Sequence, residues 1–92
     1  MNCSTTITLL SRMLCDHPNQ VYLQDRPLLF LSIEEAKEYA RKQLDNDYKK
    51  NPEFKLKEIA ERTDSDGTVF ITAYFEGGID EYRIDELTCY EP

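Results

Sequence analysis

The residues best suited to chemistry stand near the start of the chain: Cys3, Cys15 and His17 could act as nucleophiles or bind a metal. Cys15 stands two positions before His17, the only histidine, and Asp16 is the only nearby acid that could orient such a pair. A zinc site takes four ligands, commonly in paired motifs such as CxxC, which this segment lacks. We therefore predict no catalytic residue, no metal, no cofactor and three reduced thiols.

Two further motif classes are tested by their spacing. The segment 64–67, DSDG, has the alternating acids of a calcium-binding loop. If Gly67 were the sixth position of such a loop, Arg62 and Ala73 would stand at the first and twelfth positions, where carboxylates are required. No glycine-rich phosphate-binding motif and no GxSxG is present, and the chain has only 3 glycines. The sequence therefore predicts a protein that is not an enzyme.

The negative charge of the chain lies in its last third. Residues 63–92 carry eight acidic residues against one basic residue, which equals the whole net charge of −7, whereas residues 1–62 carry ten of each. Binding to phosphates requires a basic surface, so we do not expect nucleic acid as a direct partner. The expected partner is a protein with a basic surface, which an acidic chain would attract over a distance.

Length and composition indicate a single folded domain over 1–92. The chain is 40% hydrophobic and 32% charged, a composition typical of a folded globular domain. The longest apolar run, PLLFL at 27–31, is too short to span a bilayer, and the first residues lack the basic start of a signal peptide. Three cysteines cannot all pair within one chain, which suits a reducing compartment, so we expect a cytoplasmic protein. Because the apolar run is too short to span a bilayer, we expect no membrane partner.

The clearest expected element is a helix over 33–49. Ser32 and Glu35 form a capping box, in which each side chain accepts a hydrogen bond from a free backbone N–H at the helix start. Apolar residues then recur at steps of three and four, and Asn51-Pro52 ends the pattern. This apolar stripe consists of Ile33, Ala36, Ala40, Leu44 and Tyr48. A second helix is expected over 5–16, where Ile7, Leu10 and Leu14 share one helical face, although the run TTIT also favours a strand.

The remaining segments predict an antiparallel sheet. Short strands are expected at 19–24 and 27–31, either as a hairpin or as one interrupted edge strand. The segment 54–63 fits a strand or a helix, and we favour a strand because 68–76 otherwise lacks a neighbour on one side. A loop of Gly77 and Gly78 then leads into a strand at 79–87. The predicted class is α+β, an antiparallel meander with both helices packed on one face.

A Gly77-Gly78 loop would pair Ala73 with Tyr82 and Ile71 with Ile84 on the face towards the helix. The opposite face would then carry acidic and aromatic side chains, a composition that suits a recognition surface. We expect a partner-binding set drawn from this region and the adjoining tail: Phe70, Tyr74, Glu76, Asp80, Glu81, Asp85, Glu86 and Tyr90. The alternative interpretation is that these acids only solvate the exposed face of a sheet whose other face is packed against the helices.

In its size, acidity and lack of motifs, and in the asymmetry of Asp80, Glu81, Asp85, Glu86 and Glu91, the chain resembles a class of proteins. This class is the small phage and mobile-element inhibitors of bacterial defence, of the anti-CRISPR and anti-restriction type. The resemblance matches no family motif and transfers no functional residue. It implies a protein that binds a nuclease of the host and mimics DNA at its nucleic-acid-binding surface.

Three functional hypotheses follow from the residues. The first is a binding module that occupies the nucleic-acid-binding surface of an effector protein. The second is a small cytosolic interaction or assembly protein, with a homodimer as one form, in which the acidity is only solubilising. The third, a thiol-based factor using Cys3, Cys15 or Cys89, lacks any visible partner thiol or setting that would lower a thiol pKa.

Overall fold

The computed structural model describes residues 4–17, 20–23 and 26–90, with side chains at 6–15 and 26–88. The elements are β1 (Ser4–His17), β2 (Gln20–Leu23), β3 (Leu28–Phe30), α1 (Ile33–Lys50), the 3₁₀ turn η1 (Pro52–Phe54), β4 (Leu56–Thr63), β5 (Val69–Phe75) and β6 (Gly78–Tyr90). One α-helix and an antiparallel sheet confirm the α+β class. No helix in the described ranges is long and apolar enough to cross a membrane.

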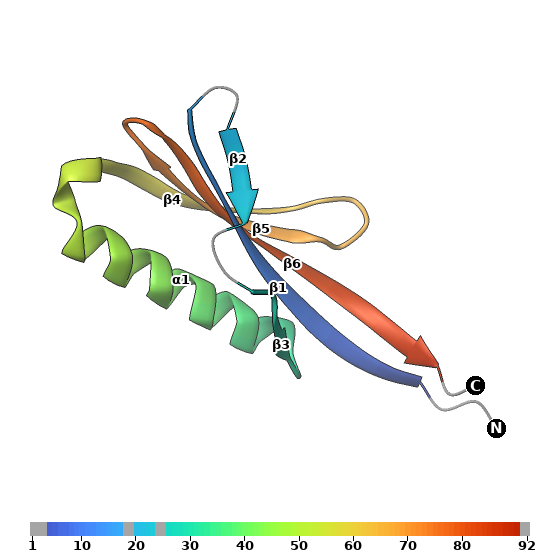
Figure 1. The fold of residues 1–92 in the computed structure, drawn as a ribbon. Coiled ribbons are helices and arrows are strands. Elements are labelled where there is room, and N and C mark those ends of the chain that lie inside the picture. The colour runs from blue at the N-terminus through green and yellow to red at the C-terminus, as the bar shows by residue number, and fades with distance from the viewer. Residues whose placement is uncertain (1–3, 18–19, 24–25, 91–92) are drawn as a thin grey trace.

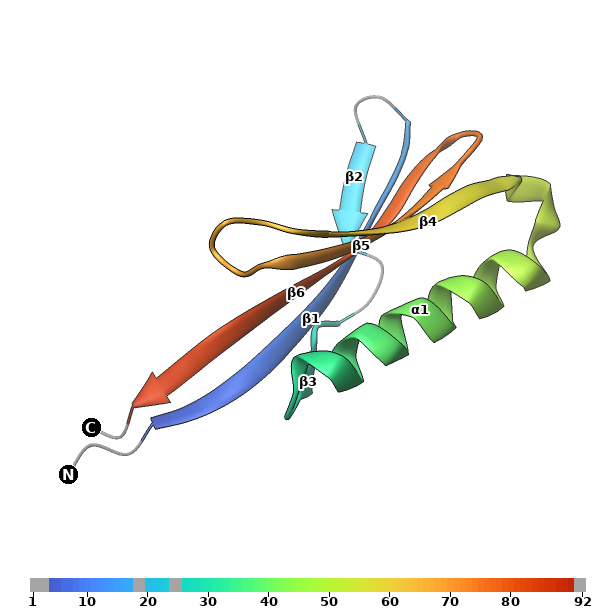
Figure 2. The same cartoon turned by 180° about the vertical axis from the view of Figure 1, so that it is seen from behind.

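The sheet runs in the order β2-β1-β6-β5-β4, and β3 also pairs with β1. All pairs are antiparallel. The N-terminal and C-terminal strands are therefore neighbours at the centre of the sheet. Together they form a long ribbon that extends past the N-terminal end of α1 (Figure 1). Seen from both sides, α1 lies along one face of the sheet only (Figures 1 and 2).

Helix α1 forms where the sequence predicts it. Ser32 is extended, with φ −144° and ψ 153°, and its Oγ accepts a hydrogen bond from the Glu35 N–H at 3.2 Å, so the N-terminal cap is confirmed. At the other end, the Asn51 N–H donates to the Asp47 carbonyl at 3.1 Å before Pro52 starts η1. Both ends of the helix are thus fixed by local hydrogen bonds.

The core lies between α1 and the sheet face that it covers. Ala36, Ala40 and Leu44 are fully buried and pack against side chains of three strands. Small alanines let the helix approach the sheet closely, and Leu44 fills the remaining space. The sheet contributes Leu10, Val69, Ile71, Ala73, Tyr82 and Ile84.

The helix predicted over 5–16 is wrong, because this segment is the strand β1. It pairs with β6 from Ser4 opposite Tyr90 to Cys15 opposite Ile79. The segment has apolar residues on both faces of a strand, and a continuous apolar run of this kind also fits one helical face. Pairing with strands on both edges favours the strand, because it gives the backbone N–H and C=O groups of this segment hydrogen-bond partners. The β-branched residues at the start of the segment also favour a strand.

The predicted order of a meander is not confirmed, since it would place the short strands beside 54–63, whereas β2 and β3 pair with β1 and β4 lies at the opposite edge of the sheet. β2 and β3 do not pair with each other, because each takes part of the same edge of β1. The strand favoured over 54–63 is confirmed as β4, preceded by the turn η1. The backbone of η1 holds the next hairpin, because the Phe54 carbonyl accepts a hydrogen bond from the Glu76 N–H at 3.2 Å.

The β5–β6 hairpin turns one residue earlier than predicted, which shifts the cross-strand partners by two residues. Phe75 pairs with Gly78, so Ile71 lies opposite Tyr82 and Val69 lies opposite Ile84. A slip of two residues keeps every side chain on its predicted face, because strand side chains alternate with a period of two. The predicted faces are therefore right and the predicted cross-strand partners are wrong.

Replacement of Ile71 by alanine should lower the free energy of unfolding by about 2–5 kcal/mol, because a buried aliphatic side chain is removed from a packed core. Ile71 has 0% exposure. The matched control is Leu31→Ala at a leucine that is 85% exposed, where the change should stay within about 0.5 kcal/mol. Urea denaturation measures both, and equal small effects would contradict the assigned core.

Candidate functional site

The sheet face opposite α1 is named the uncovered face. Strand alternation and the cross-strand pairs place on it side chains from β1, β3, β4, β5 and β6. Its members are Ile7, Leu9, Ser11, Met13, Cys15, Leu29, Glu58, Ala60, Arg62, Phe70, Thr72, Tyr74, Ile79, Glu81, Arg83, Asp85 and Leu87. Four of the eight predicted partner-binding residues belong to it: Phe70, Tyr74, Glu81 and Asp85.

The sequence predicts an acidic and aromatic face, and in the structure two arginines also lie among these four residues. The guanidinium groups of Arg62 and Arg83 lie 4.3 Å and 5.9 Å from the ring centroid of Phe70. Asp85 accepts a hydrogen bond from Arg83 Nε at 2.9 Å, and this contact raises the Arg83 pKa above its ordinary value. Glu81 accepts from Thr72 Oγ1 at 2.8 Å. This half of the face therefore carries charges of both signs.

The other four predicted residues lie elsewhere. Glu76 stands in the β5–β6 turn and pairs with Lys55 at 3.3 Å. Glu86 is exposed, but alternation directs it to the α1 side, opposite Thr8. Tyr90 ends β6, and its side chain lies outside the described part. Asp80 is only 1% exposed and lies opposite Ala73 on the α1 side, so the uncovered face does not include it.

An apolar half of the uncovered face was missed by the sequence analysis. Leu29 is 65% exposed and Leu87 44%. Ile7 lies opposite Leu87 and Leu9 lies opposite Leu29, and both β1 residues are half-buried. Tyr74, which is 41% exposed, lies opposite Ile79, near the other end of β6. The sequence carries a signal for this surface in the neighbouring pairs Leu9-Leu10 and Met13-Leu14. Adjacent apolar residues in a strand point to opposite faces, so β1 is apolar on both.

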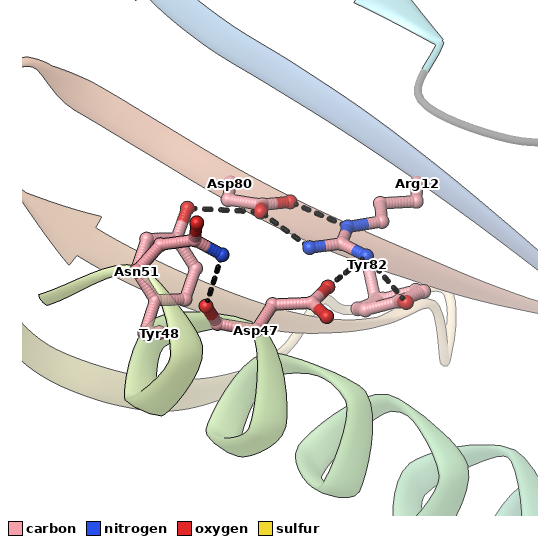
Figure 3. A network of polar contacts seen from close by, with 6 residues as sticks. All are labelled: Arg12, Asp47, Tyr48, Asn51, Asp80 and Tyr82. Carbon is pink, nitrogen blue, oxygen red and sulfur yellow. Dashed lines mark hydrogen bonds and ion pairs between the residues drawn. The ribbon is translucent and has the colours of Figure 1, made fainter. Parts of the chain in front are cut away.

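Asp80 instead belongs to a buried polar network centred on Arg12 (Figure 3). Arg12 donates from Nε to Asp80 Oδ1 at 2.9 Å and from Nη2 to Asp80 Oδ2 at 2.7 Å. Its Nη1 contacts Asp47 Oδ2 at 2.8 Å and donates to the Tyr82 hydroxyl at 3.2 Å. Tyr48 donates its hydroxyl hydrogen to Asp80 Oδ2 at 2.9 Å. The network thus joins β1, β6 and the last turns of α1.

The surroundings of Arg12, Tyr48 and Tyr82 raise the pKa of each of these side chains. Burial alone would lower the Arg12 pKa, but the hydrogen bonds and charge of Asp80, with the contact to Asp47, raise it above its ordinary value. Burial raises the pKa of Tyr82 to about 12, and burial with the nearby Asp80 also raises that of Tyr48. Neither phenol ionises at neutral pH, so neither supplies a general base. The arrangement fits a structural and binding role.

The candidate metal and thiol residues are described only in part. Cys3 lies outside the described residues, as do the side chains of His17 and Cys89. Within the described ranges, no group of three or more His, Cys, Asp or Glu side chains is arranged to hold a metal ion. The predictions of no metal and of reduced thiols stay predictions.

Removing one partner of the buried ion pair should be costly, because the other charge is left without its counter-ion. Arg12→Met or Asp80→Leu alone should lower the free energy of unfolding by about 3–5 kcal/mol. The double variant should cost clearly less than the sum of the two, which a double-mutant cycle in urea measures. A control is the exposed pair Lys49–Asp45, where Lys49→Met should cost about 0.5 kcal/mol or less. Additive effects at Arg12 and Asp80 would contradict the pairing.

Comparison with protein-family models, with curated proteins and with solved structures gives no match for this chain.

Proposed function

We propose that the protein is a non-enzymatic protein-binding module and that the uncovered face is its contact surface. The observation that supports this proposal is the exposure of Leu29, Leu87 and Tyr74 on a sheet face that no helix of the described residues covers (Figures 1 and 2). A sheet with one face in water usually alternates apolar and polar residues. β1 departs from this rule, since apolar residues occupy both of its faces.

The composition of the face suits an interface better than plain contact with water. Interfaces combine an apolar centre with a polar rim, and they are enriched in aromatic residues and arginine. Here the apolar half around Leu9, Leu29 and Leu87 adjoins a half in which Arg62 and Arg83 stack on Phe70. The net charge of −7 supports a partner with a basic surface, because opposite charges speed the encounter.

A narrower proposal, an inhibitor that mimics nucleic acid in the cytoplasm of its host, has one supporting feature. A hollow of about 290 Å³ beside the β4–β5 turn is lined by Asp66, Asp85 and Glu86 against Arg83 alone. The Asp64 N–H donates to the Thr68 carbonyl at 2.8 Å and closes the turn, in which Gly67 takes the positive φ of 89°. Carboxylates held at such a place suit a groove that binds phosphates.

The contact surface is tested by paired substitutions. Leu29→Asp with Leu87→Asp adds charge to the apolar half, and Leu31→Asp makes the same change at an exposed leucine outside the strands. Immobilised wild type and the Leu31 control should retain the same protein from an extract of the source organism, and the double variant should lose it. Retention by all three chains would contradict the proposed surface. If the captured protein is the chain itself, sedimentation will show a dimer, which supports the assembly alternative.

The narrower proposal is tested with the captured protein. Asp85→Lys with Glu86→Lys should slow association about tenfold, because exposed charges steer encounters. The wild-type rate should also fall as salt rises, since screening limits such charges to about 8–10 Å. The matched control reverses two exposed helix acids, Glu38→Lys with Asp45→Lys. Equal slowing by both double variants, or a rate independent of salt, would contradict the nucleic-acid mimic.

A further inference from the structure

A second feature lies on the α1 side of the sheet, away from the uncovered face. It is a pocket of about 210 Å³ at the C-terminal end of α1, beside the Arg12 network (Figure 3). Arg12, Asp47, Asn51 and Asp80 form its polar wall, and Tyr48, Phe54 and Phe75 contribute rings. Its charge, its position on the helix and its rings each point to one kind of ligand.

The charge of the pocket is negative. Asp47 and Asp80 contribute two carboxylates, and the single guanidinium of Arg12 already uses Nε, Nη1 and Nη2 on Asp80, Asp47 and Tyr82. The Asp47 side chain is 39% exposed and so remains accessible from solvent. A ligand that donates hydrogen bonds and carries positive charge would complete this wall, whereas an anion would be repelled.

The end of α1 adds to the same preference. Asp47 lies in the last turns of the helix and Asn51 is its C-cap, whose side-chain Nδ2 donates to the Asp47 carbonyl at 2.8 Å. With Nδ2 turned to the helix, the Asn51 side chain has its oxygen left as an acceptor. A helix C-terminus carries a partial negative charge, which favours a cation. Lys49 in the last turn already pairs with Asp45 at 2.9 Å, so its ammonium group is directed to Asp45.

The remaining wall is aromatic. The ring centroids of Tyr48, Phe54 and Phe75 lie 5.6–6.1 Å apart in all three pairs. Phe54 is 46% exposed although it is a large apolar residue. A cation over an aromatic face is attracted by the electrons of the ring, and the aliphatic stem of an amine packs on the same surface.

We propose that this pocket binds one ammonium or guanidinium group carried on an aliphatic stem. The group lies between Asp47 and the rings, and the stem packs on Phe54. Two sources share this chemistry, a free alkylamine and the side chain of a lysine or arginine in another protein. The site lies on the other side of the sheet from the uncovered face, so it stands independently of the proposed function.

The experiment is an NMR titration of the ¹⁵N-labelled chain with N-acetyl-lysine methylamide. The amide signals of Asp47, Asn51 and Phe54 should shift saturably, with a dissociation constant of about 1 mM for so small a ligand. N-acetyl-norleucine methylamide has nearly the same stem without the ammonium and should bind at least about tenfold more weakly. Equal binding of both ligands, or no saturable shift with the lysine derivative, would overturn the proposal.

Two variants locate the site. Asp47→Asn should weaken the lysine derivative about tenfold, and Arg12 would still contact Asp80 and Tyr82. Asp45→Asn is the matched control on the same helix and should leave binding unchanged. Unchanged signals outside the pocket verify that each variant is folded, and unchanged binding by the Asp47 variant would overturn the proposal. n-Butylammonium decides the source: equal affinity assigns the pocket to free amines, and tenfold weaker binding assigns it to protein side chains.

Discussion

The buried ion pair between Arg12 and Asp80 is the constraint on which the rest of the structure depends. It joins side chains 68 positions apart in the chain, on the two central strands β1 and β6. A buried guanidinium needs its counter-ion and its hydrogen bonds, so β1 can pair with β6 only where Arg12 reaches Asp80. Asp47 and Tyr48 bring α1 to the same point, so the helix is positioned by the pair as well.

The pair also explains the register of β1 against β6. In this register Arg12 lies opposite Tyr82 and Asp80 lies opposite Leu14. The hydrophobic pattern of the two strands does not decide between registers that differ by two residues, because both keep the same residues facing α1. A buried charge with a fixed partner distinguishes them, since a slip would separate it from that partner. Buried polar groups can specify one arrangement in this way even where they add little stability.

Much of the fold was predictable where local physics and tertiary packing agree. The cap at Ser32 and the stripe of Ala36, Ala40 and Leu44 predict α1, and alternation predicts β5 and β6. β1 was not predictable in this way, because a strand that is apolar on both faces resembles a helical stripe. The candidate site was predicted only in part. The number of acidic residues in a segment does not show which of them are exposed, as Glu86 is, and which are buried with a counter-ion, as Asp80 is with Arg12. Arg62 joins the face only through the pairing of β4 with β5.

The two faces of β1 connect the fold with the proposed function. Leu10 and Arg12 point towards α1, where the core and the network bury them. Leu9 and Met13 point to the uncovered face and remain half-buried, and the exposed Leu29 lies opposite Leu9. The same apolar pattern that gives β1 its central place therefore leaves a surface that a partner can cover. The pocket at the end of α1 lies on the opposite side, so one small sheet can present two separate binding surfaces.

The central claim is that β1 is a strand held against β6 by the Arg12–Asp80 pair. NMR measurement of nuclear Overhauser effects in the ¹⁵N,¹³C-labelled chain tests it most directly. The account predicts cross-strand effects between Leu10 and Ile84 and between Arg12 and Tyr82, which are paired residues of β1 and β6. Strong sequential amide–amide effects through 5–16 without these cross-strand contacts would indicate a helix and would contradict the account.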